Sequence, residues 1–232
     1  GVGRDYFYFP GDGFGYGFNL AGHYQFNDQW AAGLSYRSQV KVRAWGDVGF
    51  TDVNGNIPGT LYNMAVRDGS AHAEVVLPDS VSGGVSYTPI PELSFEAGAI
   101  WTRWSTFRSL RIHIPETTLS PAGISESKKK WDDVWRLNLG VEWKPLDWLA
   151  LRAGYVWDQS PMTERYADYL IPTADRNIYS LGVGFRYDAW TLDLAYAYID
   201  AKGRNYDASA ETHVLESKAK STRTDIFSMS LG

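Results

Sequence analysis

The sequence contains no cysteine, only four histidines and no long uninterrupted apolar segment. The absence of cysteine excludes a disulfide-stapled scaffold and any cysteine-ligated metal site. A membrane-spanning helix needs about 18 consecutive apolar residues, and no stretch of this chain approaches that length. These absences exclude both a small disulfide-rich domain and a helical membrane protein.

The chain also lacks a surplus of positive charge, since its formal net charge is -5. Its one notable basic run, residues 128–130, is bracketed by Glu126 and Asp132, so we expect no nucleic-acid partner. The first residues have no basic region followed by an apolar core, so no signal peptide is expected within this numbering. The scattered histidines fall in no catalytic or metal-binding spacing, and we expect neither an enzyme nor a metal or cofactor site.

Aromatic residues and glycine are abundant, with 15 Tyr, 10 Trp, 10 Phe and 23 Gly, and apolar residues alternate with polar ones along much of the chain. In the segment 149–157 every second residue is apolar, while Arg152 and Asp158 belong to the alternate row. Alternation of this kind predicts half-buried β-strands. About nine such segments are predicted, at residues 13–26, 30–40, 77–89, 93–104, 134–143, 148–158, 178–187, 190–198 and 225–232.

Tight turns and long polar connections alternate between the predicted strands, and the first long connection covers residues 44–70. This layout is typical of an outer-membrane barrel, and aromatic residues gather at both ends of the apolar rows like its two girdles. In a soluble β-sheet the polar row would be rich in Lys and Glu. Here that row is mostly Gly, Ser, Ala and Asn. The fold class is therefore predicted to be all-β, an antiparallel transmembrane β-barrel.

The few charged residues of the polar row are expected to point into the barrel lumen. A charged side chain inside the barrel needs a partner of opposite sign. The residues concerned are Glu142, Arg152, Arg186 and Asp193. We expect Arg152 to pair with Glu142 or Asp193.

An odd number of antiparallel strands cannot close into a barrel without one parallel pair, and bacterial single-chain barrels have even strand numbers. We therefore expect residues 1–232 to be a single β-barrel domain that is a fragment of a larger barrel, with strands missing on the N-terminal side. The last strand ends at Leu231 and Gly232 without the usual terminal aromatic residue, so a few C-terminal residues are also expected to be missing.

Several local motifs occur together and in order: "WTRWSTFRSLRI", "WDDVWRLNLGVEW", "LRAGYVWDQSPM", "IPTADRNIYSLGVGFRY" and "LDLAYAYID". Together with "LPDSVSGGVSY" and the segment from Gly13 to Ser38, this set resembles the C-terminal half of FadL-type outer-membrane transporters of long-chain fatty acids and other hydrophobic compounds. The resemblance implies a barrel of about 14 strands, blocked by an N-terminal hatch and opened by a lateral gap. The hatch, roughly five earlier strands and the kinked strand at the gap are not in this sequence.

The resemblance also implies a function, which is passive uptake of hydrophobic small molecules, above all long-chain fatty acids, by a monomer in the bacterial outer membrane. By position in the family pattern, Lys130 is the candidate for binding a carboxylate head group. A solvated loop charge or a contact to lipopolysaccharide are its alternatives. Trp104 is expected on the lumen-side row near the outer end of its strand. The candidate ligand contacts are Lys130, Trp131, Trp104, Phe107, Arg136, Phe50, Leu61 and Met64.

Two other functions fit an outer-membrane barrel. A general diffusion porin would have a wide and strongly charged lumen, and the small, weakly charged polar row argues against it. A purely structural barrel is the other alternative.

Overall fold

The computed structural model describes residues 6–8, 11–51, 68–117, 121–167, 173–206 and 215–232. The fold of these residues is all-β, and their only helical segments are two short 3-10 helices, η1 (Trp104–Thr106) and η2 (Glu164–Tyr166). None of the helical segments in the described part of the chain has the length and hydropathy needed to cross a membrane.

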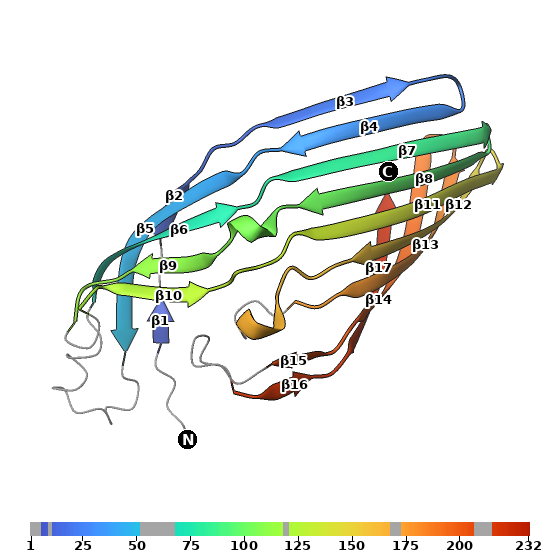
Figure 1. The fold of residues 1–232 in the computed structure, drawn as a ribbon. Coiled ribbons are helices and arrows are strands. Elements are labelled where there is room, and N and C mark those ends of the chain that lie inside the picture. The colour runs from blue at the N-terminus through green and yellow to red at the C-terminus, as the bar shows by residue number, and fades with distance from the viewer. Residues whose placement is uncertain (1–5, 9–10, 52–67, 118–120, 168–172, 207–214) are drawn as a thin grey trace.

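A curved sheet of nine antiparallel strands forms the main body (Figure 1). Each strand pairs with the next strand of the main body along the chain, which confirms the nine predicted strands and their antiparallel order. Within the described residues the edge strands do not pair with each other, so the sheet is an open wall rather than a closed barrel. The strands are β3 (Asn19–Gln25), β4 (Trp30–Arg37), β7 (Ser80–Ile90), β8 (Leu93–Thr102), β11 (Val134–Leu146), β12 (Leu149–Asp158), β13 (Arg176–Tyr187), β14 (Trp190–Ala201) and β17 (Thr222–Leu231).

Local turn chemistry explains the tight connections at one end of this sheet. Between β3 and β4, the side-chain Oδ1 of Asn27 accepts hydrogen bonds from the backbone N–H groups of Gln29 and Trp30, both at 2.9 Å, which closes an Asx-type turn. The strand register shifts between Tyr87 and Ile90, the stretch that contains Pro89. Proline cannot donate a ladder hydrogen bond, so it is tolerated at such an irregularity.

The apolar row of the main sheet is exposed rather than packed. Leu139 and Leu181, near the middle of their strands, expose 58% and 62% of their surface. Soluble monomers rarely expose a contiguous apolar surface of this kind. The row instead suits contact with hydrocarbon, with small residues such as Gly140 and Ser180 on the opposite face.

The long connections contain strands that the sequence analysis missed. The expectation of an irregular connection over residues 44–70 was wrong at both ends, because β5 (Val40–Thr51) and β6 (Gly69–Leu77) pair with each other there. Val40, Val42 and Ala44 alternate with polar residues as a strand requires, but residues 52–68 separate β5 from β6, which is too long a stretch to be recognised as a hairpin turn from the sequence. The remaining loop strands are β1 (Tyr6–Tyr8), β2 (Gly11–Phe14), β9 (Ser109–His113), β10 (Ile124–Lys128), β15 (Arg204–Tyr206) and β16 (Ser217–Ala219).

The first predicted strand is divided in two. Residues 15–18 belong to no strand, so β2 pairs with β5 while β3 pairs with β4. The chain passes very close to β5 at this break, since a Cβ atom on Gly15 would lie 2.8 Å from the carbonyl oxygen of Lys41. Glycine permits this close approach of two backbones.

Candidate functional site

A cluster of buried side chains, which we call the loop core, lies beneath the long loops. Its members come from different connections of the chain, yet all of them are nearly inaccessible to solvent. Val75, Trp104 and Leu110 are partly buried and pack against it. The loop core consists of Phe107, Trp131, Met162, Ala167 and Tyr206.

The aromatic rings of this region meet edge to face. The Trp131 ring centroid lies 4.9 Å from that of Trp104 and 5.1 Å from that of Phe107, with interplanar angles of 64° and 73°. This arrangement places the positive edge of one ring against the negative face of the next. Three of the predicted ligand contacts, Trp104, Phe107 and Trp131, are thus brought together by the structure.

Trp104 does not occupy the predicted position on a strand. The strand β8 ends at Thr102, and Trp104 begins the helix η1, which turns its ring onto the loop core. After Trp101 the alternation breaks, since Arg103 falls on the apolar row and Trp104 on the polar row, and the predicted strand was extended past this break.

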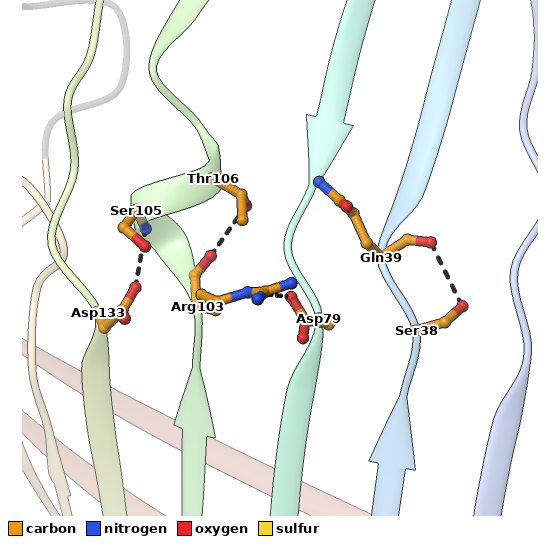
Figure 2. A network of polar contacts seen from close by, with 7 residues as sticks. All are labelled: Ser38, Gln39, Asp79, Arg103, Ser105, Thr106 and Asp133. Carbon is orange, nitrogen blue, oxygen red and sulfur yellow. Dashed lines mark hydrogen bonds and ion pairs between the residues drawn. The ribbon is translucent and has the colours of Figure 1, made fainter.

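Polar contacts around η1 hold its position, and Figure 2 shows them together. The guanidinium Nε of Arg103 donates to Oδ1 of the buried Asp79 at 2.8 Å. The backbone N–H of Ser105 donates to Oδ1 of Asp133 at 2.9 Å, and the Thr106 hydroxyl donates to the carbonyl of Arg103 at 2.9 Å. These bonds connect the end of β8 to the segments that precede β7 and β11.

The lysine run, residues 128–130, directly precedes Trp131 of the loop core. Lys129 is fully buried, whereas Lys130 is exposed and has a positive φ of 42°. The Nζ of Lys130 donates a hydrogen bond to the Tyr166 hydroxyl at 2.8 Å and lies 4.8 Å from the centroid of the Tyr166 ring. An ammonium group over an aromatic face is a favourable cation–π contact.

One residue of the loop core, Trp131, and the neighbour of another, Thr163, each have a buried polar atom whose hydrogen-bonding capacity is unused. The indole Nε1 of Trp131 and the hydroxyl Oγ1 of Thr163 are buried and have no hydrogen-bond partner in the described part of the chain. Leaving a buried donor unsatisfied costs about 1–3 kcal/mol. Such a cost is unusual and calls for an explanation.

Arg204 ties the fourth long connection to the third, and the sequence analysis did not identify it. Its Nη1 donates to the carbonyl oxygen of Met162 at 2.6 Å, and its Nη2 donates to Oγ of Ser160 at 3.1 Å. The backbone N–H of Ser160 in turn donates to Oδ1 of Asp175 at 2.9 Å. The sequence around Arg204 does not predict these partners, because they are more than 40 residues away along the chain.

On the polar face of the main sheet, Arg152 bridges two carboxylates. Its Nε lies 2.6 Å from Oε2 of Glu142 and its Nη1 lies 2.7 Å from Oδ1 of Asp193, while Lys144 lies 2.7 Å from the other oxygen of Glu142. Arg152 reaches Asp193 across β13, where a Cβ atom on Gly184 would lie 2.6 Å from the Asp193 oxygen. Three of the four predicted lumen charges are therefore joined, with Lys144 as an unpredicted fourth member.

The other predicted site residues lie apart from these groups. Arg136 on β11 and Arg186 on β13 are exposed and form no ion pair with any described residue. Phe50 lies on β5 opposite Phe7. Leu61 and Met64 lie outside the described residues.

Comparison with known proteins identifies relatives over nearly the whole chain. The profile of the family described as "Outer membrane protein transport protein (OMPP1/FadL/TodX)" matches residues 6–229. A putative outer membrane protein of Neisseria meningitidis is 25% identical over 91% of this chain and 48% of its own length. Outer membrane protein P1 of Haemophilus influenzae is 28% identical over 81% of this chain and 38% of its own. The long-chain fatty acid transport protein of Escherichia coli K12 is 25% identical over 90% of this chain and 47% of its own.

Solved structures show the same fold. A FadL homologue of Pseudomonas aeruginosa superposes with a TM-score of 0.80 at 24% identity, covering 93% of this chain and 51% of its own. The toluene transporter TodX of Pseudomonas putida superposes with a TM-score of 0.60 at 16% identity, covering 94% of this chain and 48% of its own. The chain spans about half or less of the length of the relatives it matches. This chain belongs to the OMPP1/FadL/TodX family of outer-membrane transport proteins.

Proposed function

We propose that the protein mediates passive uptake of hydrophobic small molecules through the outer membrane, and that its principal ligands are long-chain fatty acids. Two kinds of relative support a hydrophobic ligand. One is named for long-chain fatty acid transport, and others of the same fold are named as toluene transporters. Loop-core chemistry favours an amphipathic acid over a pure hydrocarbon.

The observation that carries this choice is the position of Lys130 beside the aromatic loop core. The ammonium group of Lys130 donates a hydrogen bond to the Tyr166 hydroxyl. The next residue along the chain is Trp131, whose ring is buried. A fatty acid has the same division, since a charged carboxylate is joined to an apolar chain. The carboxylate would accept charge-assisted hydrogen bonds from Lys130.

The unsatisfied indole N–H of Trp131 adds a second donor suited to such a ligand. A buried donor without a partner gains a full hydrogen bond when an acceptor arrives, so it favours a ligand that carries oxygen. Toluene offers no such acceptor. We therefore expect fatty acids to bind more tightly than aromatic hydrocarbons of similar apolar area.

The test is oleate binding to the purified outer-membrane protein that carries this chain. We expect Lys130→Ala to weaken binding roughly 10- to 100-fold, the equivalent of losing a hydrogen bond to a charged group. The matched control is Lys220→Ala, an exposed lysine between β16 and β17. Equal oleate affinity in the Lys130 variant and the original protein would reject the head-group role.

Liposome flux tests the wider proposal. Saturable oleate passage without passage of small sugars supports a hydrophobic-compound transporter. Unselective passage of small sugars would instead identify a general diffusion porin. No catalytic step enters the proposed function, and turnover of bound oleate would contradict it.

A further inference from the structure

The sheet formed by the loop strands carries a groove that lies beside the loop core. Its volume is about 590 Å³, and it is lined by β5, β6, β9 and the segment just before β9. Strands β5, β6 and β9 lie side by side in the order of their pairing (Figure 1). The groove therefore crosses three strands contributed by two different long connections.

Three ring-bearing side chains form one row across this groove. Trp45 on β5 is opposite His72 on β6, and His72 is opposite His113 on β9. The two imidazole rings stack face to face, with centroids 4.2 Å apart and planes only 3° from parallel. Trp45 is 53% exposed, so its indole is available for contact.

Charged side chains form the neighbouring row. Arg43 bonds Glu74 at 3.1 Å and Arg111 bonds Glu126 at 2.8 Å, and Glu74 is directly opposite Arg111. Alternating charges thus run from β5 through β6 and β9 to β10. These pairs balance one another.

One further guanidinium also lines the groove. Arg108 is exposed and forms no ion pair with any residue that the structure describes. Because the four charges of the neighbouring row cancel, Arg108 gives the groove a net positive charge.

These rows are not needed to pack the sheet. On β6 the alternate residues Ala71 and Ala73 are buried, whereas His72 and Glu74 on the opposite face are exposed. Apolar packing therefore uses the other face of the strand. The exposed face is left with flat rings, paired hydrogen-bonding groups and one uncompensated guanidinium.

We propose that this groove binds a sugar that carries a phosphate group. A pyranose ring has an apolar C–H face that packs on an aromatic ring such as Trp45. Its hydroxyl groups match the donors and acceptors of the charged row, and the planar fork of Arg108 suits bidentate contact with phosphate. This ligand differs from the fatty acid of the proposed function, although Phe107 lines both this groove and the loop core. In the outer membrane, lipopolysaccharide or a free sugar phosphate would supply this chemistry.

The experiment measures binding by the purified, detergent-solubilised protein that carries this chain. The probes are a deacylated lipopolysaccharide core oligosaccharide, the same oligosaccharide after removal of its phosphates, and glucose 6-phosphate. We expect Arg108→Gln to weaken binding of the phosphorylated core at least about 10-fold. Its effect on the dephosphorylated core should be under about two-fold, because the phosphate contact is already absent.

Trp45→Ala should weaken binding of both forms of the core equally, because it removes stacking rather than charge. Arg186→Gln and Trp190→Ala are the matched controls, since both residues are exposed but lie at the opposite end of the main sheet. Neither control should change the affinity. Heat-modifiable migration on gels checks that every variant remains folded.

The free sugar phosphate distinguishes the two sources of ligand. Glucose 6-phosphate binding at least about 10-fold weaker than the core assigns the site to lipopolysaccharide. Equal affinities assign it to free sugar phosphates. Unchanged core affinity in Arg108→Gln overturns the proposal, as does loss of binding when EDTA is added, because the stacked histidines would then hold a bridging metal ion instead.

Discussion

Leu139 and Leu181 in the main sheet expose 58% and 62% of their surface, whereas Phe107 and Trp131 beneath the loops expose 6% and 5%. The same apolar chemistry is thus displayed in one region and hidden in the other. This difference is the one expected for an outer-membrane protein, in which hydrocarbon would solvate the outer face of the wall while water would surround the loops. The part of the molecule that resembles a soluble protein is therefore the loop region, and the two regions should respond differently to substitution.

Phe107→Ala should have the largest effect, and this effect should be confined to the loops. Removing a buried phenylalanine costs about 3–5 kcal/mol in a packed core. Because the main sheet has its own continuous ladder of backbone hydrogen bonds, we expect the long loops to become sensitive to protease while the thermal midpoint of the barrel stays nearly constant. Phe227→Ala is the matched control, since that ring is 79% exposed on β17. A large fall in the barrel midpoint for Phe107→Ala would show that the regions are not independent.

Leu139→Arg should have the next largest effect, and it should act on the wall. A charged side chain facing lipid near the bilayer midplane costs about 2–4 kcal/mol. Ser180→Arg places the same side chain on the opposite, small-residue face and should cost much less. The free energy of unfolding in lipid vesicles measures both. Similar losses in the two variants would mean that the Leu139 row does not face hydrocarbon.

Protonation of Glu126 should have the smallest effect on stability, and this effect should be confined to the loop strands. Hydrogen bonds from Arg111 and then Ser109 hold the pKa of this exposed carboxyl below its usual value of 4.5. Because the folded pKa is depressed, the contribution of this ion pair to stability is present above pH 4.5 and is lost as the pH falls through the folded value.

A side-chain NMR titration of Glu126 measures this shift directly. Arg111→Gln should move the pKa back up toward 4.5, while Arg43→Gln, which removes the neighbouring pair, should move it far less. An unchanged Glu126 pKa in Arg111→Gln would mean that the ion pair between Arg111 and Glu126 does not form in solution.

Much of the wall was predictable because the information is local. Alternation along segments such as 149–158 determines both the existence of a strand and which residues share its apolar face, since side chains of a strand point to opposite faces in turn. The pairing of Arg152 with Glu142 followed from the same alternation once neighbouring strands were aligned. The reach of Arg152 to Asp193 across β13 was less obvious, because it depends on the absence of a side chain at Gly184.

The loops were less predictable because their contacts are distant in sequence. Trp104 was expected at the end of its strand, yet the structure places it in η1, where Arg103 is bound to Asp79 and Ser105 to Asp133. No local sequence pattern predicts these hydrogen bonds. The loop strands β5 and β6 escaped prediction for a different reason, because residues 52–68 separate them and the sequence has no short hairpin turn signal between them.

The sequence by itself determined the nine wall strands, their antiparallel order and the apolar row that the structure leaves exposed, because a two-residue period is a property of neighbouring residues. The tertiary structure alone decided that Phe107 and Tyr206 share one core, that Lys130 lies at Tyr166, and that Trp45, His72 and His113 form one row. These contacts join residues brought together only when the wall aligns the ends of its strands. Their physical basis is burial and complementarity between segments, which no single segment contains.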